Sequence, residues 1–115
     1  MKYLFAIVVF NLISCASDSD SDLYNSILKD DITYTADVKP IITENCIMCH
    51  SQPPQNGAPI SLTTYEQVKY AVEERGLISR ISSNDAGFWM PFGGNRLPQN
   101  KIDLITEWST TGLTE

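Results

Sequence analysis

The sequence contains two cysteines followed directly by its only histidine, in the order Cys46-Ile47-Met48-Cys49-His50. This C-x-x-C-H pattern is the attachment motif of c-type haem, in which two thiols bond to one porphyrin. The histidine imidazole then supplies the proximal iron ligand. The motif therefore predicts one haem c per chain, bonded to Cys46 and Cys49 and ligated by His50. Such a group offers a large apolar surface on which the helices of a small chain can pack.

Two other uses of a C-x-x-C pair fit the sequence less well. A thioredoxin-like pair follows a buried strand in a βαβ pattern, whereas the segment before Cys46 has a helical pattern. A zinc site commonly takes four ligands from two Cys pairs or from Cys and His pairs, and this chain has a single histidine and no second Cys pair. A haem-free thiol-disulfide protein therefore stays as an alternative, below haem attachment.

Length and charge limit the classes of protein to which the chain can belong. With 115 residues, of which 43% are hydrophobic, it suits one small domain. The formal net charge of −6 and the lack of a basic stripe predict that nucleic acid is not a partner. A protein with a basic docking surface would be attracted instead.

The N-terminus has the pattern of an export signal. Lys2 precedes an apolar run, residues 4–10, which is shorter than the ~20 residues that a membrane-spanning helix needs. Leu12-Ile13-Ser14-Cys15 resembles a bacterial lipobox, whose cysteine is lipidated and becomes the new N-terminus. We therefore expect a lipoprotein signal peptide over 1–14, lipidation at Cys15, and an extracytoplasmic protein anchored to a bacterial membrane, on its periplasmic side or at the outer membrane. A disulfide to Cys15 is the alternative, but the haem motif already uses the other two thiols.

A Ser/Asp-rich run, residues 16–22, follows the lipobox. Small polar side chains of like charge bury too little apolar surface to fold, so we expect a flexible linker over 15–33. Alternating Asp residues can also bind calcium, but the glycine and closing glutamate of an EF-hand loop are missing. The globular domain is expected over 34–115.

Helical patterns dominate that domain. Asp37 is expected to cap a first helix, with Pro40 in its first turn and apolar residues at helical spacing inward: Val38, Ile41 and Ile42. A turn-rich loop, 51–59, follows His50 and is expected to offer a backbone carbonyl to its second ring nitrogen.

Three further helical signals follow this loop. Thr64 and Gln67 form a capping box for a helix that ends at Gly76. A short helix then has three apolar side chains inward: Leu77, Ile78 and Ile81. The last helix is expected from about Pro98 to Gly112, with Ile102, Ile105 and Trp108 on one face. The pattern predicts an all-α fold.

Residues 82–97 have no helical periodicity and include Met90-Pro91. A lone methionine is most often a core residue. Here, however, no second histidine exists, Met1 belongs to the signal peptide and Met48 lies inside the attachment motif. Elimination therefore predicts that Met90 is the distal iron ligand.

Taken together, these residues resemble the small class I c-type cytochromes, specifically the bacterial lipoprotein type. The resemblance covers residues 34–113 and rests on the attachment motif, on Met90-Pro91, and on Leu97-Pro98 before a helix with Trp108 and Gly112. It implies a cytochrome c-like fold of three to five short helices around one haem. Phe92 is a departure, because a proline or glycine is common at that position in the family.

The resemblance and the predicted ligands imply one-electron transfer rather than catalysis, since two protein ligands leave no open iron position. A redox partner protein would dock transiently. Arg80 and Arg96 are candidates for contacts with the haem propionates, and solvated surface arginines are the alternative. A haem-based sensor or peroxidase-like protein with a displaceable distal ligand is the other functional class that the sequence allows.

Overall fold

The structure, a computed structural model, describes residues 31–115. The expected signal peptide (1–14), the lipidation site Cys15 and the Ser/Asp-rich run of the linker lie outside the described residues. In the part of the chain that is described, no helix is both long and apolar enough to cross a membrane.

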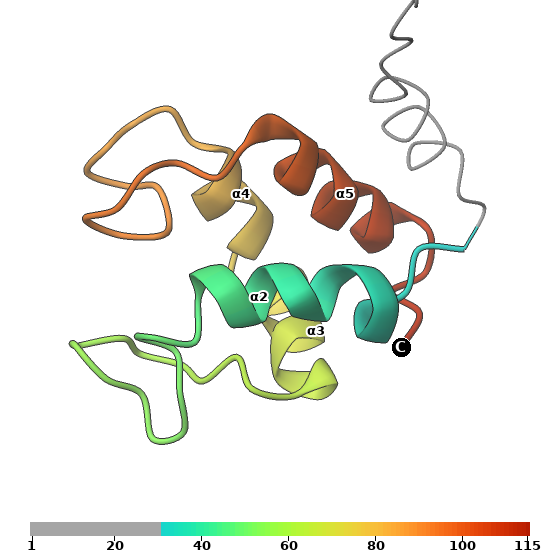
Figure 1. Cartoon of the computed structure of the whole chain (residues 1–115), viewed down its shortest axis with the longest axis horizontal. Helices are drawn as coiled ribbons and strands as arrows, with labels where there is room; N and C mark the ends of the chain where they lie inside the picture. The colour runs from blue at the N-terminus through green and yellow to red at the C-terminus, as the bar shows by residue number, and fades with distance from the viewer. Residues whose placement is uncertain (1–30) are drawn as a thin grey trace, which may run out of the picture.

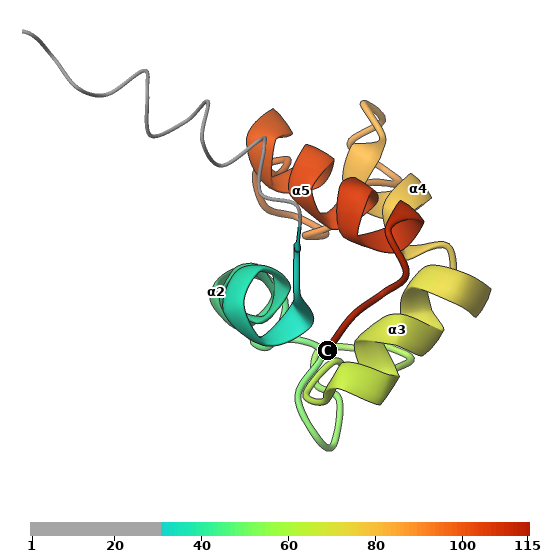
Figure 2. The ribbon, with the colours of Figure 1, turned by 90° about the vertical axis from the view of Figure 1, so that its right-hand side faces the viewer.

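The all-α prediction is confirmed for residues 31–115, which contain helices and no strand. The elements are η1 (Tyr34–Val38), α2 (Lys39–Asn45), α3 (Tyr65–Glu74), α4 (Leu77–Ser82) and α5 (Gln99–Thr110). The short helix η1 runs directly into α2. α5 contacts both η1 and α4, and α4 contacts α3, so the helices surround a common interior (Figures 1 and 2).

The first helix begins earlier than the sequence suggested, so the prediction of Asp37 as its N-cap was wrong. Thr33 is the N-cap, and its side chain accepts a hydrogen bond from the Ala36 N–H at 3.2 Å. The Asp37 carboxylate lies inside the first turn and accepts from the Thr33 N–H at 2.9 Å. The Thr33 hydroxyl and the Asp37 carboxylate can each accept from free N–H groups at a helix start, so the pattern alone did not locate the start.

The boundaries predicted for the middle of the chain are confirmed. Thr64 caps α3, and the reciprocal capping box with Gln67 is complete. Gly76 separates α3 from α4 with a φ of 67°, a left-handed conformation that costs little for glycine and more for other residues. The short connection turns α4 so that Leu77 and Ile81 are buried in the core.

The core contains the apolar faces that the helical spacing predicted. Val38, Ile105 and Trp108 have no exposed surface, and Trp108 lies in an aromatic cluster with Tyr34 and Tyr65, at 6.0 and 6.4 Å between ring centres. The carbonyl of Thr114 accepts hydrogen bonds from the Trp108 indole and the Tyr34 N–H, both at 2.8 Å. The C-terminus is thereby held beside the start of η1 (Figure 2).

Two long loops lie at the same end of the molecule. One joins α2 to α3 and carries His50; the other joins α4 to α5 and carries Met90 (Figure 1). The prediction of a non-helical segment over 82–97 is confirmed except at Ser82, which is the last residue of α4; α5 begins at Gln99. The helices therefore act as a scaffold that brings two distant loops together.

Candidate functional site

The attachment motif forms one tight turn at the C-terminal end of α2. Cys46 is the C-cap of that helix, and its N–H donates to the Ile42 carbonyl at 2.8 Å. The Cys46 carbonyl accepts from the N–H groups of Cys49 at 3.2 Å and His50 at 2.9 Å. Residues three and four positions apart in such a turn share one face. Both thiols and the imidazole accordingly line the same cavity.

The tautomer of His50 follows from one hydrogen bond. Its Nδ1 lies 2.8 Å from the Ile60 carbonyl oxygen. Because a carbonyl can only accept, Nδ1 must donate, which leaves the lone pair on Nε2 available to a metal ion. The expected backbone carbonyl therefore exists, one residue beyond the loop predicted over 51–59. The His50 carbonyl in turn accepts from the Leu62 N–H at 2.8 Å, so both sides of the residue are held.

The cavity between the two loops has a volume of about 340 Å³ and is lined mainly by apolar side chains from all four α-helices and the loops. Its apolar lining includes Ile42, Leu62, Leu77, Ile81, Leu97 and Ile105. Pockets that hold cofactors are typically of this size or larger, apolar, with few polar groups. Here the polar or reactive groups are those of the attachment turn, of two arginines and of two asparagines, together with the Met90 sulfur.

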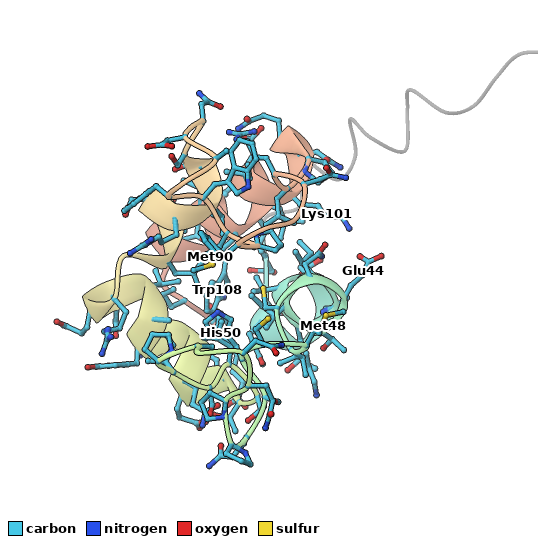
Figure 3. All side chains as sticks on the ribbon, turned by 90° about the vertical axis from the view of Figure 1, so that its left-hand side faces the viewer. Glu44, Met48, His50, Met90, Lys101 and Trp108 are labelled. Atoms are coloured by element: carbon cyan, nitrogen blue, oxygen red, sulfur yellow. The ribbon has the colours of Figure 1, made fainter. Side chains whose placement is uncertain are left out.

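Met90 reaches this cavity from the second loop. It lines the cavity and packs against the core, and its N–H donates to the Arg80 carbonyl at 3.1 Å. Met48 is 83% exposed and is not part of the cavity lining. Figure 3 shows Met48 at α2, away from the space that His50 and Met90 share. Of the described methionines, only Met90 is therefore placed to act together with His50.

The two arginines singled out in the sequence have different surroundings. Arg80 lines the cavity, donates from Nη1 to the Phe88 carbonyl at 3.2 Å, and lies 3.9 Å from the Phe88 ring centre. Arg96 is not among the lining residues. Its guanidinium donates to the carbonyls of Ser83 at 2.9 Å and Ser82 at 3.0 Å.

Sequence reasoning missed several residues at the cavity, among them Arg75 and Asn56. Arg75 lines it from the end of α3, and the Asn56 amide lies 3.5 Å from the Cys49 sulfur. Neither belongs to a recognisable motif. Asn56 precedes Gly57 in a turn-rich segment, which indicated a loop but not its contact with a thiol.

The environment of Cys46 disfavours its thiolate. Burial, and then the neighbouring Cys49, raise the pKa of the Cys46 thiol to about 11. The thiol also lies at the C-terminal end of α2, where the helix dipole favours cations over anions. Reactive dithiols are found in the opposite setting, at helix N-termini or beside cations, with a lowered pKa. The two cysteines are free thiols in the structure.

The residues at the cavity fit a c-type haem. Two thiols, an imidazole with a free Nε2 and a thioether all line one apolar space, and these are donors found in haem attachment and ligation. Within residues 31–115, no group of three or more His, Cys, Asp or Glu side chains is arranged to hold a metal ion by itself.

Comparison with protein families, with curated proteins and with solved structures finds no match to this chain.

Proposed function

We propose that this protein is a monohaem c-type cytochrome of the small class I type, and that it transfers single electrons. One observation carries the proposal. The chain brings Cys46, Cys49, His50 and Met90 to a single apolar cavity, although Met90 lies forty residues beyond the motif. If Met90 were only a core residue, there would be no reason for it to line the same cavity as the attachment motif.

Each residue would have a separate task at the bound haem. Cys46 and Cys49 would retain it covalently, His50 would ligate the iron through Nε2, and Met90 through its sulfur. The haem supplies a reversible one-electron change of the iron, and a soft thioether ligand raises the reduction potential. The apolar lining of the cavity would limit the access of water to the haem, and two protein ligands would leave no iron position for a substrate. The protein is therefore proposed as an electron carrier and not as an enzyme.

The proposal extends to location and partners. A lipid on Cys15 would anchor the protein at an extracytoplasmic membrane surface, with residues 16–30 as a spacer, because Ile32 is buried in the core and Thr33 caps η1. Two or more acyl chains would hold the protein to the membrane far better than one. The formal charge of −6 favours a redox partner with a basic docking surface, so the rate of electron transfer should fall as ionic strength rises.

Covalent attachment is tested by mass spectrometry. The protein is exported by a bacterial host that has haem-attachment machinery, together with the double variant Cys46→Ser, Cys49→Ser. The expected result is one added haem on the wild-type protein and none on the double variant. An unmodified wild-type mass would rule out the haem and leave the thiol-disulfide alternative.

The distal ligand is tested by absorption spectroscopy of the purified protein and of Met90→Ala. The oxidised wild-type protein should show the long-wavelength band of methionine-ligated haem, and Met90→Ala should lose it. The reduced wild-type protein should bind carbon monoxide slowly and Met90→Ala rapidly. Rapid binding by the wild-type protein would favour a sensor or peroxidase-like function instead.

The lipid anchor has its own test. Cys15→Ala should move the protein from the membrane fraction to the soluble fraction of a host that processes lipoproteins. Retention of Cys15→Ala in the membrane would contradict the anchor without affecting the haem assignment.

A further inference from the structure

The loop that carries Met90, residues 83–97, is bound to the last turn of α4. The final carbonyl groups of any helix have no partner within that helix. In α4 these groups are used by the loop: the Arg80 carbonyl accepts from the Met90 N–H at 3.1 Å. The Ser82 carbonyl accepts from the Arg96 side chain at 3.0 Å. The helix end and the loop therefore complete each other's hydrogen bonding.

Arg80 contacts this loop with its side chain as well as its backbone. Its Nη1 donates to the Phe88 carbonyl at 3.2 Å, and its guanidinium lies over the Phe88 ring at 3.9 Å from the centre. Phe88 is 40% exposed, so apolar burial holds this part of the loop only weakly. Three contacts from one residue thus restrain the chain from Phe88 to Met90.

The position of Met90 needs such a restraint because the loop contains glycines, which allow many backbone conformations. Gly87 precedes Phe88, and Gly93 and Gly94 follow shortly after Met90. Gly93 has a φ of +74° and open space around its Cβ position. A thioether on such a loop competes well for iron only when the loop is ordered before ligation, since the ordering entropy otherwise weakens the bond.

We propose that Arg80 is a positioning residue, which holds Met90 at the cavity through Phe88 rather than serving mainly as a charge for haem propionates. This inference rests on the proposed function, because it assumes that Met90 ligates the iron. The guanidinium of Arg80 is engaged by the loop, through its hydrogen bond to the Phe88 carbonyl and its contact with the Phe88 ring.

Arg75 provides a matched control. It lines the same cavity and carries the same charge, but it lies at the C-cap of α3. Among the described residues, no hydrogen bond or cation–π contact joins the Arg75 side chain to Phe88 or Met90. If positive charge near the haem controls how easily imidazole displaces Met90, then Arg75→Gln and Arg80→Gln should both change the imidazole affinity. An effect of loop positioning should appear only in Arg80→Gln.

The experiment measures how readily imidazole displaces Met90 from the oxidised, haem-loaded protein, by titration of the long-wavelength band. For Arg80→Gln we expect an apparent imidazole dissociation constant about tenfold lower than for the wild-type protein. One hydrogen bond and one cation–π contact account for a change of that size, equal to about 1.4 kcal/mol. Arg80→Lys should fall between the two, because lysine keeps the charge but not the planar group that stacks on Phe88.

For Arg75→Gln we expect a change of about twofold or less, as for most surface substitutions. Equal shifts in Arg75→Gln and Arg80→Gln, or no shift in Arg80→Gln, would overturn the positioning role. If Arg80→Gln does not fold by circular dichroism, Arg80→Lys and Phe88→Leu decide. Phe88→Leu removes only the ring, so its imidazole dissociation constant should fall about threefold, and wild-type affinity in both variants would overturn the inference.

Failure of the proposed function gives a different result. If the wild-type protein lacks the methionine band and binds imidazole as readily as Met90→Ala, then Met90 is not the ligand, whatever the arginine variants do.

Discussion

Replacing Gln67 with alanine should destabilise the domain, because this side chain fastens the start of α3 to the loop that carries His50. Its Oε1 accepts hydrogen bonds from the Thr63 N–H at 2.8 Å, the Thr63 hydroxyl at 3.0 Å and the Thr64 N–H at 3.3 Å. Its Nε2 donates to the Gln52 side chain at 2.9 Å. All four bonds are lost in Gln67→Ala.

The magnitude follows from the exposure of these bonds. Each is solvent-exposed, so water replaces much of what is lost and the net effect of each is well below that of a buried bond. Loss of a helix cap costs typically about 1 kcal/mol, and the contact with Gln52 adds a few tenths. We therefore expect the free energy of unfolding to fall by about 1.5 kcal/mol, and Tm by roughly 6–12 °C for a domain of this size.

Gln67→Glu is the matched control. Glutamate keeps the acceptor for the residues that precede α3 and loses only the donor to Gln52. At neutral pH its charge lies at the helix N-terminus, which is favourable by about 0.3–1 kcal/mol. The unfolding free energy of Gln67→Glu should therefore stay within about 0.5 kcal/mol of the wild-type value.

The assay is urea unfolding followed by far-UV circular dichroism, with all proteins in the same haem-loaded form. Equal losses in Gln67→Ala and Gln67→Glu would show that the acceptor oxygen is unimportant and would refute the capping argument. A loss below about 0.3 kcal/mol in Gln67→Ala would refute it as well.

Other substitutions test separate features. Gly76→Ala should lower the unfolding free energy by about 1 kcal/mol, because alanine is strained at a φ of +67° and its Cβ would lie 3.1 Å from the Ser79 hydroxyl; unchanged urea unfolding would contradict this. Trp108→Phe should cost about 1–3 kcal/mol, since it leaves a void in the core and removes the 2.8 Å bond to the Thr114 carbonyl; a loss under 0.5 kcal/mol, within the range of surface changes, would count against that role. In protein made without haem attachment, alkylation of Cys46 should reach half its maximal rate near pH 11, because burial raises the pKa of this thiol to about 11; a midpoint near the usual thiol pKa of about 8.5 would contradict it. The same raised pKa means that the free-thiol form is most stable at lower pH and loses stability as pH rises towards 11.

Several features of the fold could be predicted from the sequence because they depend only on residues a few positions apart in the chain. The capping box at Thr64 and the turn at Gly76 follow from backbone requirements that a few residues satisfy. The spacing of Ile102, Ile105 and Trp108 places them on one helix face, and all three are buried. The prediction failed where two local solutions compete, at the start of the first helix, because both Thr33 and Asp37 can satisfy its free N–H groups.

The sequence by itself determined which functional groups are available: two thiols and an imidazole in one turn, and one further thioether. It also determined which helices bury an apolar face. Only the tertiary structure decided which groups meet. The Ile60 carbonyl that sets the His50 tautomer, the contact of Arg80 with Phe88, and the presence of Met90 and Arg75 at one cavity all join segments without a common pattern. Such contacts depend on how whole helices pack against one another, and helix packing is the sum of many weak apolar contacts between residues distant in sequence.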